Sequence, residues 1–229
     1  MKNQKGFTII ELLIASVAFT VILVLVTTIV IQVSKIYYKG VVLSNTQNVD
    51  STIIQDVSKD IQFGSNSSNL QISKKIAGNI EIYCIGDNVF IFNPGQEFVS
   101  PGTNIGLLYG SSLPCSSVSP TKIDVLNYIN NYGFHELLNP MMRVINFSIN
   151  NNLPNGLLYG INIGIAFGSD QSLCNTSVAS SCINSDVMST SGNYKNYFGS
   201  NIQCKLQQGD QYCGTSYLNT VVANEYNLN

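Results

Sequence analysis

The sequence of 229 residues contains no tryptophan, a single histidine and few charged residues. Charged side chains make up 10% of the chain, well below the roughly 25% of ordinary soluble domains. The formal net charge of −2 provides no broad basic surface. The charge therefore does not indicate nucleic acid as a partner, although it does not exclude one. Because tryptophan is absent, the 12 tyrosines and 10 phenylalanines must supply the large core side chains.

The motifs of common enzyme and metal sites are also missing. His135 is followed by Glu136, but Asn139 stands where the second histidine of an H-E-x-x-H zinc helix belongs. Phosphate-binding glycine loops, G-x-S-x-G and calcium loops do not occur. A surface or loop position is the preferred interpretation of His135, and Asp56 and Asp60 are more typical of a solvated helix face than of catalysis. The sequence therefore predicts a protein that is not an enzyme and that has no cofactor and no metal.

Proline is absent before Pro94, so one helix from about Phe7 to Phe63 is allowed, with a length of roughly 85 Å. Its first part, Leu12 to Ser34, has 23 residues without a formal charge, which at roughly 34 Å is enough to cross a bilayer. One acid, Glu11, stands at the start of this segment, where burying its charge is costly. Since no base follows within the segment, we expect the partner of Glu11 to come from another molecule.

The second part of this helix has an apolar stripe that is typical of packing against a domain. The stripe consists of Val42, Thr46, Val49, Ile53, Val57 and Ile61. The solvated side is expected to hold Gln47, Asp50, Gln55, Asp56, Lys59 and Asp60. Gly40 is a weak point, and Gly64 with the Ser/Asn-rich run after it predicts a helix end. A helix that is apolar in its first half and striped in its second is typical of a filament subunit, and a membrane anchor with a spacer helix is the alternative.

After residue 70 the apolar period changes to two, which indicates strands. Residues 80–84 and 89–92 flank the turn residues Gly86-Asp87-Asn88 and predict a hairpin. Residues 144–150 and 157–167 predict a second antiparallel pair with one face against the long helix. A short helix is expected at Lys122 to Tyr132.

Six cysteines lie beyond the apolar segment, at Cys84, Cys115, Cys174, Cys182, Cys204 and Cys213. An even number in an exported region indicates disulfides, and short loops favour Cys84–Cys115, Cys174–Cys182 and Cys204–Cys213. A zinc site is the rival, but no two cysteines are closer than eight positions. From Gly168 onward we expect a loop-rich, disulfide-stapled region. Its tyrosines could form a recognition surface or pack against the loops.

The start of the chain carries a more specific pattern. Lys2 and Lys5 precede Gly6-Phe7-Thr8, which Ile9, Ile10, Glu11, Leu12 and Leu13 follow. This pattern resembles the amino-terminal signature of type IV prepilins and type II secretion pseudopilins. The resemblance implies that a prepilin peptidase cuts after Gly6 and that Phe7 becomes N-methylated. Glu11 would then be the acid that meets the terminal amine of a neighbouring subunit during assembly. A signal anchor with an incidental glutamate, or a cleaved secretory peptide, are the alternatives.

We therefore expect a pilin-like α+β fold in which one long amino-terminal helix packs on an antiparallel sheet and a disulfide-stapled extension follows. The expected regions are a leader at 1–6, a transmembrane or filament-core helix at 7–34, an amphipathic half-helix at 35–63, a sheet domain at 70–167 and a carboxy-terminal region at 168–229.

The expected function is that of a structural filament subunit. A mature length of about 223 residues is large for a principal subunit. Residues Asp56 to Ile61 resemble the helix end of minor pilins and minor pseudopilins of the PilW or GspJ type, so a minor pilin is favoured. A type II secretion pseudopilin, or a tip adhesin or DNA-uptake pilin, is the alternative. The expected partners are other pilin subunits, the prepilin peptidase, an inner-membrane assembly platform and, before assembly, membrane lipid. The chain would cross the inner membrane once with its domain outside, although Lys35 and Lys39 weaken the charge asymmetry, and then enter a cell-surface or periplasmic filament.

Overall fold

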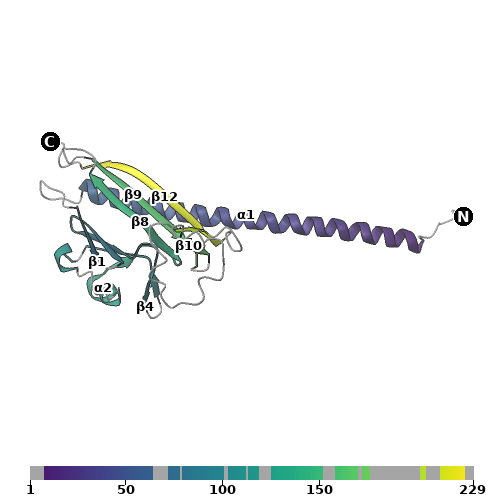
Figure 1. Ribbon diagram of the computed structural model, residues 1–229, viewed down its shortest axis with the longest axis horizontal. Coiled ribbons are helices and arrows are strands. Elements are labelled where there is room, and N and C mark those ends of the chain that lie inside the picture. The colour runs from purple at the N-terminus through teal and green to yellow at the C-terminus, as the bar shows by residue number, and fades with distance from the viewer. Residues whose placement is uncertain are drawn as a thin grey trace.

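The structure is a computed structural model of the chain. It describes residues 8–63, 72–77, 79–100, 103–111, 113–118, 125–151, 158–169, 172–175, 202–204 and 212–224. In these residues one long helix is followed by short and long strands and a short helix, and a strand comes last (Figure 1). The fold is α+β, with the long helix packed on antiparallel sheets, as the sequence predicts.

Helix α1, Ile9–Phe63, is 55 residues long, and its amino-terminal half projects away from the rest of the molecule (Figure 1). Residues 8–41 are all exposed. The helix continues through Gly40, so this predicted weak point does not interrupt it. The predicted single helix is confirmed over the described residues, and its length is roughly 80 Å at the standard rise.

The carboxy-terminal part of α1 lies against the sheets through one stripe of side chains. The buried members of this stripe are Thr46, Asp50, Ile53, Val57 and Ile61. The apolar members agree with the prediction, and Val42 and Val49 at its margin are half-buried. The prediction that Asp50 faces solvent was wrong, because its side chain is 0% exposed. Asp50 lies one turn from both Thr46 and Ile53, so the helical period places it on the buried side despite its charge.

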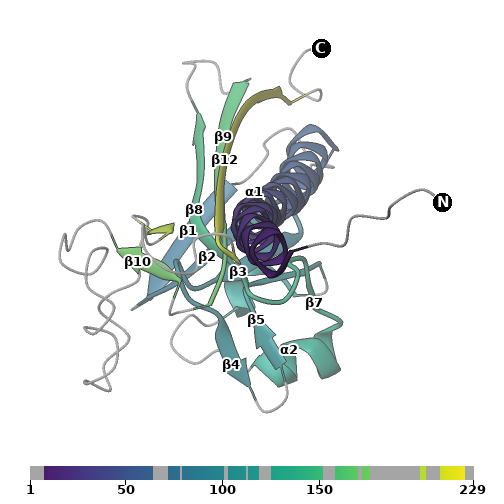
Figure 2. The same cartoon turned by 90° about the vertical axis from the view of Figure 1, so that its right-hand side faces the viewer.

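A three-stranded antiparallel sheet in the order β12-β9-β8 covers this stripe (Figure 2). Its strands are β8 (Met142–Asn151), β9 (Leu158–Phe167) and β12 (Gly214–Ala223). Strand β12 runs along α1: Gly214 lies close to Val42 and Thr46, and the Asn224 side-chain amide donates a hydrogen bond to the Ile61 carbonyl at 3.0 Å. The predicted pairing of β8 with β9 is confirmed.

Strand β12 was not predicted, because the sequence after Gly168 was interpreted as loop-rich. It has ten residues and pairs with β9 over its whole length. Polar residues interrupt the apolar run from Leu218 to Ala223. The local sequence therefore gives a weak strand signal, and the strand forms through its contacts with β9 and α1.

The second sheet has five antiparallel strands in the order β1-β2-β3-β6-β7. The strands are β1 (Ile72–Ala77), β2 (Ile80–Ile85), β3 (Asn88–Phe92), β6 (Leu107–Gly110) and β7 (His135–Glu136). The predicted hairpin corresponds to β2 and β3, whose turn places Gly86 at a φ of 58°. That left-handed conformation favours glycine.

The main hydrophobic core lies between α1 and the two sheets. It joins Ile53 and Val57 of α1 with Phe92 of β3 and Phe147 of β8. The Phe92 and Phe147 ring centroids are 5.5 Å apart. A second core on the other face of β2 and β3 contains Cys84 and also Tyr128 of α2 (Val125–Tyr132). Both faces of these two strands are therefore buried.

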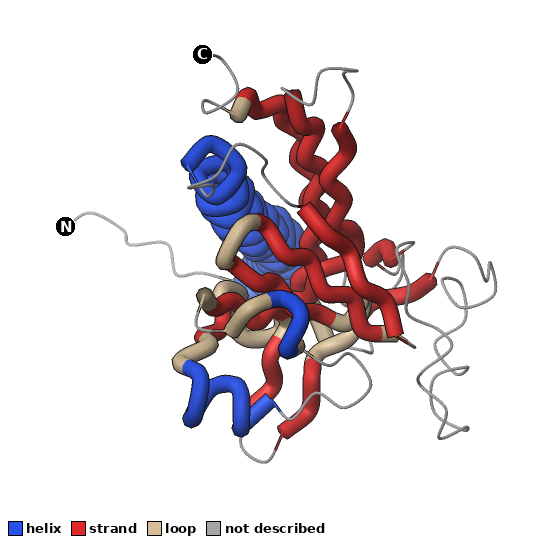
Figure 3. The backbone as a smooth tube through the Cα atoms, turned by 90° about the vertical axis from the view of Figure 1, so that its left-hand side faces the viewer, coloured by secondary structure: helices blue, strands red, loops and turns tan. Residues whose placement is uncertain are grey.

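Figure 3 shows the long helix (blue) beside the strands (red). The remaining elements are short. They are β4 (Phe98–Ser100), β5 (Thr103–Ile105), the 3-10 helix at Cys115–Ser117, β10 (Leu173–Asn175) and β11 (Ile202–Cys204). Helix α2 confirms the predicted short helix from residue 125 onward, and residues 122–124 lie outside the described part of the chain.

Candidate assembly and membrane-anchoring site

The first turn of α1 is closed by a reciprocal pair of side chains. The Thr8 amide and hydroxyl donate hydrogen bonds to Glu11 Oε2 at 2.9 and 2.7 Å. The Glu11 amide donates in return to the Thr8 hydroxyl at 3.4 Å. This is a capping box, in which the side chains satisfy N–H groups that the helix start leaves unpaired. Glu11 therefore caps its own helix through one oxygen, while Oε1 makes none of these bonds.

The hydroxyl side chains between Leu12 and Ser34 all donate hydrogen bonds within the helix. The Thr27, Thr28 and Ser34 hydroxyls donate to carbonyls one turn earlier in the helix at 2.7 to 2.8 Å. Ser16 and Thr20 donate in the same way to carbonyls three residues earlier at 2.8 Å. In an apolar medium an unpaired hydroxyl or backbone group costs several kcal/mol, so this pairing suits the segment to hydrocarbon.

By length and composition α1 qualifies as a membrane-crossing helix. Its exposed apolar side chains run almost without interruption from Ile9 to Tyr38. Contiguous exposed apolar surface of this extent marks a membrane or protein interface.

Only one of the three residues predicted to act in processing and assembly lies in the described part of the chain. Glu11 lies at the start of α1, whereas Gly6 and Phe7 lie outside the described residues. The roles of all three in processing and assembly stay predictions.

Two of the three predicted disulfides are present in the described residues. Cys84 pairs with Cys115, and Cys204 pairs with Cys213. Cys174 is also disulfide-bonded, and its predicted partner Cys182 lies outside the described residues. The first bond joins β2 to the segment after β6, and the second fixes the start of β12. Among the described residues no group of three or more His, Cys, Asp or Glu side chains could hold a metal ion.

His135 is exposed, as predicted, and its ring meets the edge of the Tyr109 ring at a centroid distance of 5.2 Å. Asp60 differs from the prediction of a solvated side chain, because it is half-buried. Burial, together with the charge of Asp56, raises the pKa of Asp60 to about 7, and the Asn88 and Tyr109 side chains oppose that rise.

Asp50 is the most deeply buried acid of α1. Neither of its carboxylate oxygens has a hydrogen-bond partner of normal geometry within the described residues. Burial raises the pKa of Asp50 to about 7, and the Ser216 hydroxyl of β12 opposes the rise. The contact between α1 and β12 thus contains an acid whose ionisation opposes folding.

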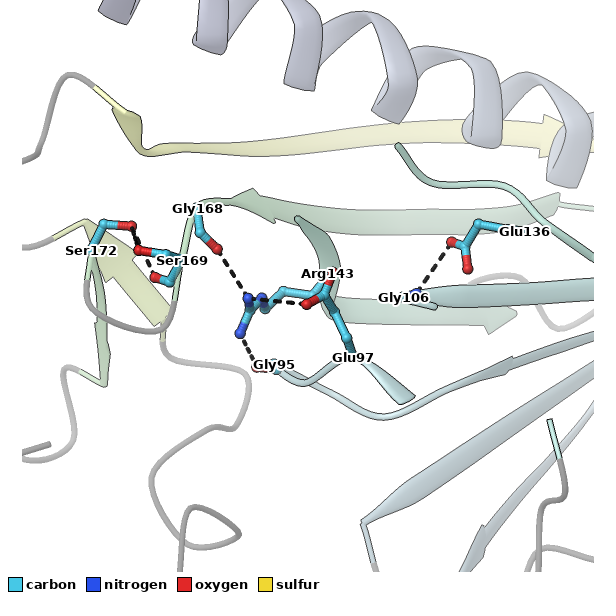
Figure 4. A network of polar contacts seen from close by, with 8 residues as sticks. All are labelled: Gly95, Glu97, Gly106, Glu136, Arg143, Gly168, Ser169 and Ser172. Atoms are coloured by element: carbon cyan, nitrogen blue, oxygen red, sulfur yellow. Dashed lines mark hydrogen bonds and ion pairs between the residues drawn. The ribbon is translucent and has the colours of Figure 1, made fainter. Parts of the chain in front are cut away.

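Arg143 at the start of β8 ties two loops to the sheets (Figure 4). Its side chain is 3% exposed and donates to the Gly168 carbonyl at 3.0 Å and to the Gly95 carbonyl at 3.5 Å. The Glu97 carboxylate lies 3.7 Å away and balances the charge. Arg143 is the only arginine of the chain. That singularity is the one feature of the sequence that points to a structural role for this residue.

Glu136 forms a second buried polar contact (Figure 4). Its Oε1 accepts hydrogen bonds from the amides of Gly106, Leu107 and Leu138 at 3.0 to 3.2 Å. Burial raises the pKa of Glu136 to about 7, and the three amides oppose that rise. No local sequence pattern predicted this role. Both contacts lie far along the chain from Glu11 and hold the domain together.

The fold defines a class of protein: an α+β domain carried on the second half of a helix whose apolar first half is exposed. Residues 1–27 match the family model described as the prokaryotic N-terminal methylation motif. The chain therefore carries the type IV pilin signature, which confirms the resemblance drawn from residues 6–13. The match covers 27 of the 229 residues and supports a pilin-like or pseudopilin protein, for which the motif implies other pilins and the prepilin peptidase as partners. Comparisons with curated proteins and with solved structures gave no match.

Proposed function

We propose that the chain is a structural subunit, and specifically a minor pilin, of a type IV pilus-like filament. The observation that carries this proposal is the exposed apolar half of α1 with a single acid at its start. No surface of the described domain covers this half-helix, so lipid must cover it before assembly and neighbouring helices afterwards.

Glu11 is the residue on which assembly depends. After cleavage behind Gly6, the methylated amine of Phe7 in one subunit would pair with the Glu11 carboxylate of another. The capping box engages Oε2 of Glu11, so Oε1 can accept from the amine while the helix start stays capped. In an apolar helix bundle an unpaired carboxylate is strongly unfavourable. Subunits are therefore expected to dock in the register that brings the Glu11 carboxylate next to the Phe7 amine of the neighbour.

The subunit would insert into the cytoplasmic membrane with its domain outside, pass to an inner-membrane assembly platform and enter the filament. Its role would be that of a binding and packing partner and not of an enzyme. Removal of residues 1–6 would leave 223 residues of the 229, which is large for a principal subunit and supports a minor role.

Shearing of filaments from cells tests the proposal. A tagged full-length chain should appear in the sheared filament fraction in a small amount relative to the principal subunit, and should disappear from it when the assembly ATPase is deleted. Retention in the membrane fraction, together with loss of protein secretion on deletion of the chain, would instead identify a secretion pseudopilin.

A further inference from the structure

Two tyrosines and two lysines occupy the turn of α1 that follows the uncharged segment. Lys35 and Lys39 are the first cations after Ser34, and Tyr37 and Tyr38 lie between them. The tyrosine side chains are 68% and 51% exposed. At the helical rise, Tyr38 lies only about 6 Å beyond Ser34, which is the depth of one head-group layer.

A third tyrosine from the other end of the chain reaches the same level. The ring centroid of Tyr212 lies 6.1 Å from that of Tyr38, which in turn lies 6.1 Å from that of Tyr37. Tyr212 is 54% exposed although the neighbouring Cys213 is buried. Three aromatic rings from two distant segments thus form one exposed cluster.

The two residues that follow Tyr212 fix its position. Cys213 is bonded to Cys204, and Gly214 approaches α1 so closely that a Cβ there would lie 3.1 Å from Val42 Cγ1. The domain therefore begins to contact α1 within about 12 Å of Ser34 along the helix axis. A flexible spacer between the apolar segment and the domain is thereby excluded for the described residues.

We propose that Tyr37, Tyr38 and Tyr212, with Lys35, form a belt that seats the domain on the lipid head groups of the outer leaflet before assembly. This inference rests on the membrane insertion proposed above. Tyrosine favours the boundary between hydrocarbon and water, and lysine ammonium groups near a helix end reach lipid phosphates. The belt is continuous with the apolar surface of α1, and it places the Cys204–Cys213 end of the domain at the membrane.

The absence of tryptophan allows a direct test. The full chain would be reconstituted into vesicles of phosphatidylethanolamine and phosphatidylglycerol that carry a spin-label quencher either near the head group or near the acyl-chain end. Y212W gives a single fluorophore in the belt. V221W, at a 65% exposed position near the other end of β12, is the matched control, about 30 Å further along the strand.

The head-group quencher should reduce the fluorescence of Y212W at least about twofold more than that of V221W. Equal and weak quenching of the two variants would overturn the belt. F19W, about 10 Å inside the start of the uncharged segment, separates this failure from a failure of membrane insertion. Strong quenching of F19W by the acyl-chain label with no quenching of Y212W would reject the belt alone, whereas no quenching of F19W would reject the membrane span itself.

Discussion

Replacing Glu11 with alanine should reduce the amount of the chain in sheared filaments at least about tenfold, because leaving one member of a buried ion pair unpaired costs roughly 3–5 kcal/mol. Membrane insertion should be unchanged, since the substitution makes the segment more apolar. Leader removal should also be unchanged. The measurement is a quantitative immunoblot of the sheared and membrane fractions from the same cells.

The capping box requires a control, because the alanine substitution also removes the hydrogen bonds to Thr8. E11Q retains a side-chain acceptor that can close the capping box but carries no charge. If pairing with a neighbour's amine is the function of Glu11, E11Q should assemble as poorly as E11A. Normal assembly of E11Q would show that Glu11 serves only as a helix cap. T8A should have the smaller effect, about 1 kcal/mol of helix stability.

Asp50→Asn should stabilise the folded domain by roughly 2–4 kcal/mol above about pH 7. The pKa of Asp50 is about 7 in the folded chain against an ordinary value of 3.8. Below about pH 4 the group is protonated in both states and has no effect. As pH rises to about 7, only the unfolded chain releases the proton, so folding loses stability, and above that pH the loss is constant.

The comparison is made on the full chain in detergent micelles, by denaturant unfolding at a series of pH values. The wild type keeps a further pH dependence of the same sign from Asp60 and Glu136, so the informative quantity is the difference between D50N and wild type. D87N, the same substitution at an exposed turn, should leave stability unchanged. A difference between D50N and wild type that does not change with pH would contradict the burial of an ionisable Asp50.

The elements with strong local patterns could be predicted from the sequence. Helix α1 has no proline and a regular apolar stripe, and the β2–β3 hairpin has an alternating strand and a continuous apolar strand on the two sides of a Gly-Asp-Asn turn. Strand β12 could not be found in this way, because its pattern of exposed and half-buried residues reflects contacts with α1 and β9 that lie far away in the sequence.

The site shows the same division. The motif around Gly6 and Glu11 is local and can be recognised in the sequence, and the T-x-x-E spacing from Thr8 to Glu11 is likewise a local signal of the capping box. Asp50 was placed on the solvated side because of its charge, whereas its spacing from Ile53 places it on the buried stripe. Tyr212 joins Tyr38 only through the close approach of Gly214 to α1, a contact that no local pattern encodes.

The most direct test of filament assembly through Glu11 is mass spectrometry of the mature chain isolated from its own cells. The intact mass is measured first, and fragmentation then identifies the amino-terminal residue and its modification. We expect a chain that begins at Phe7, with the first six residues absent and one methyl group on the terminal amine. A chain that retains Met1 and an unmodified Gly6–Phe7 bond would contradict filament assembly through Glu11 and would leave a domain anchored by a membrane helix.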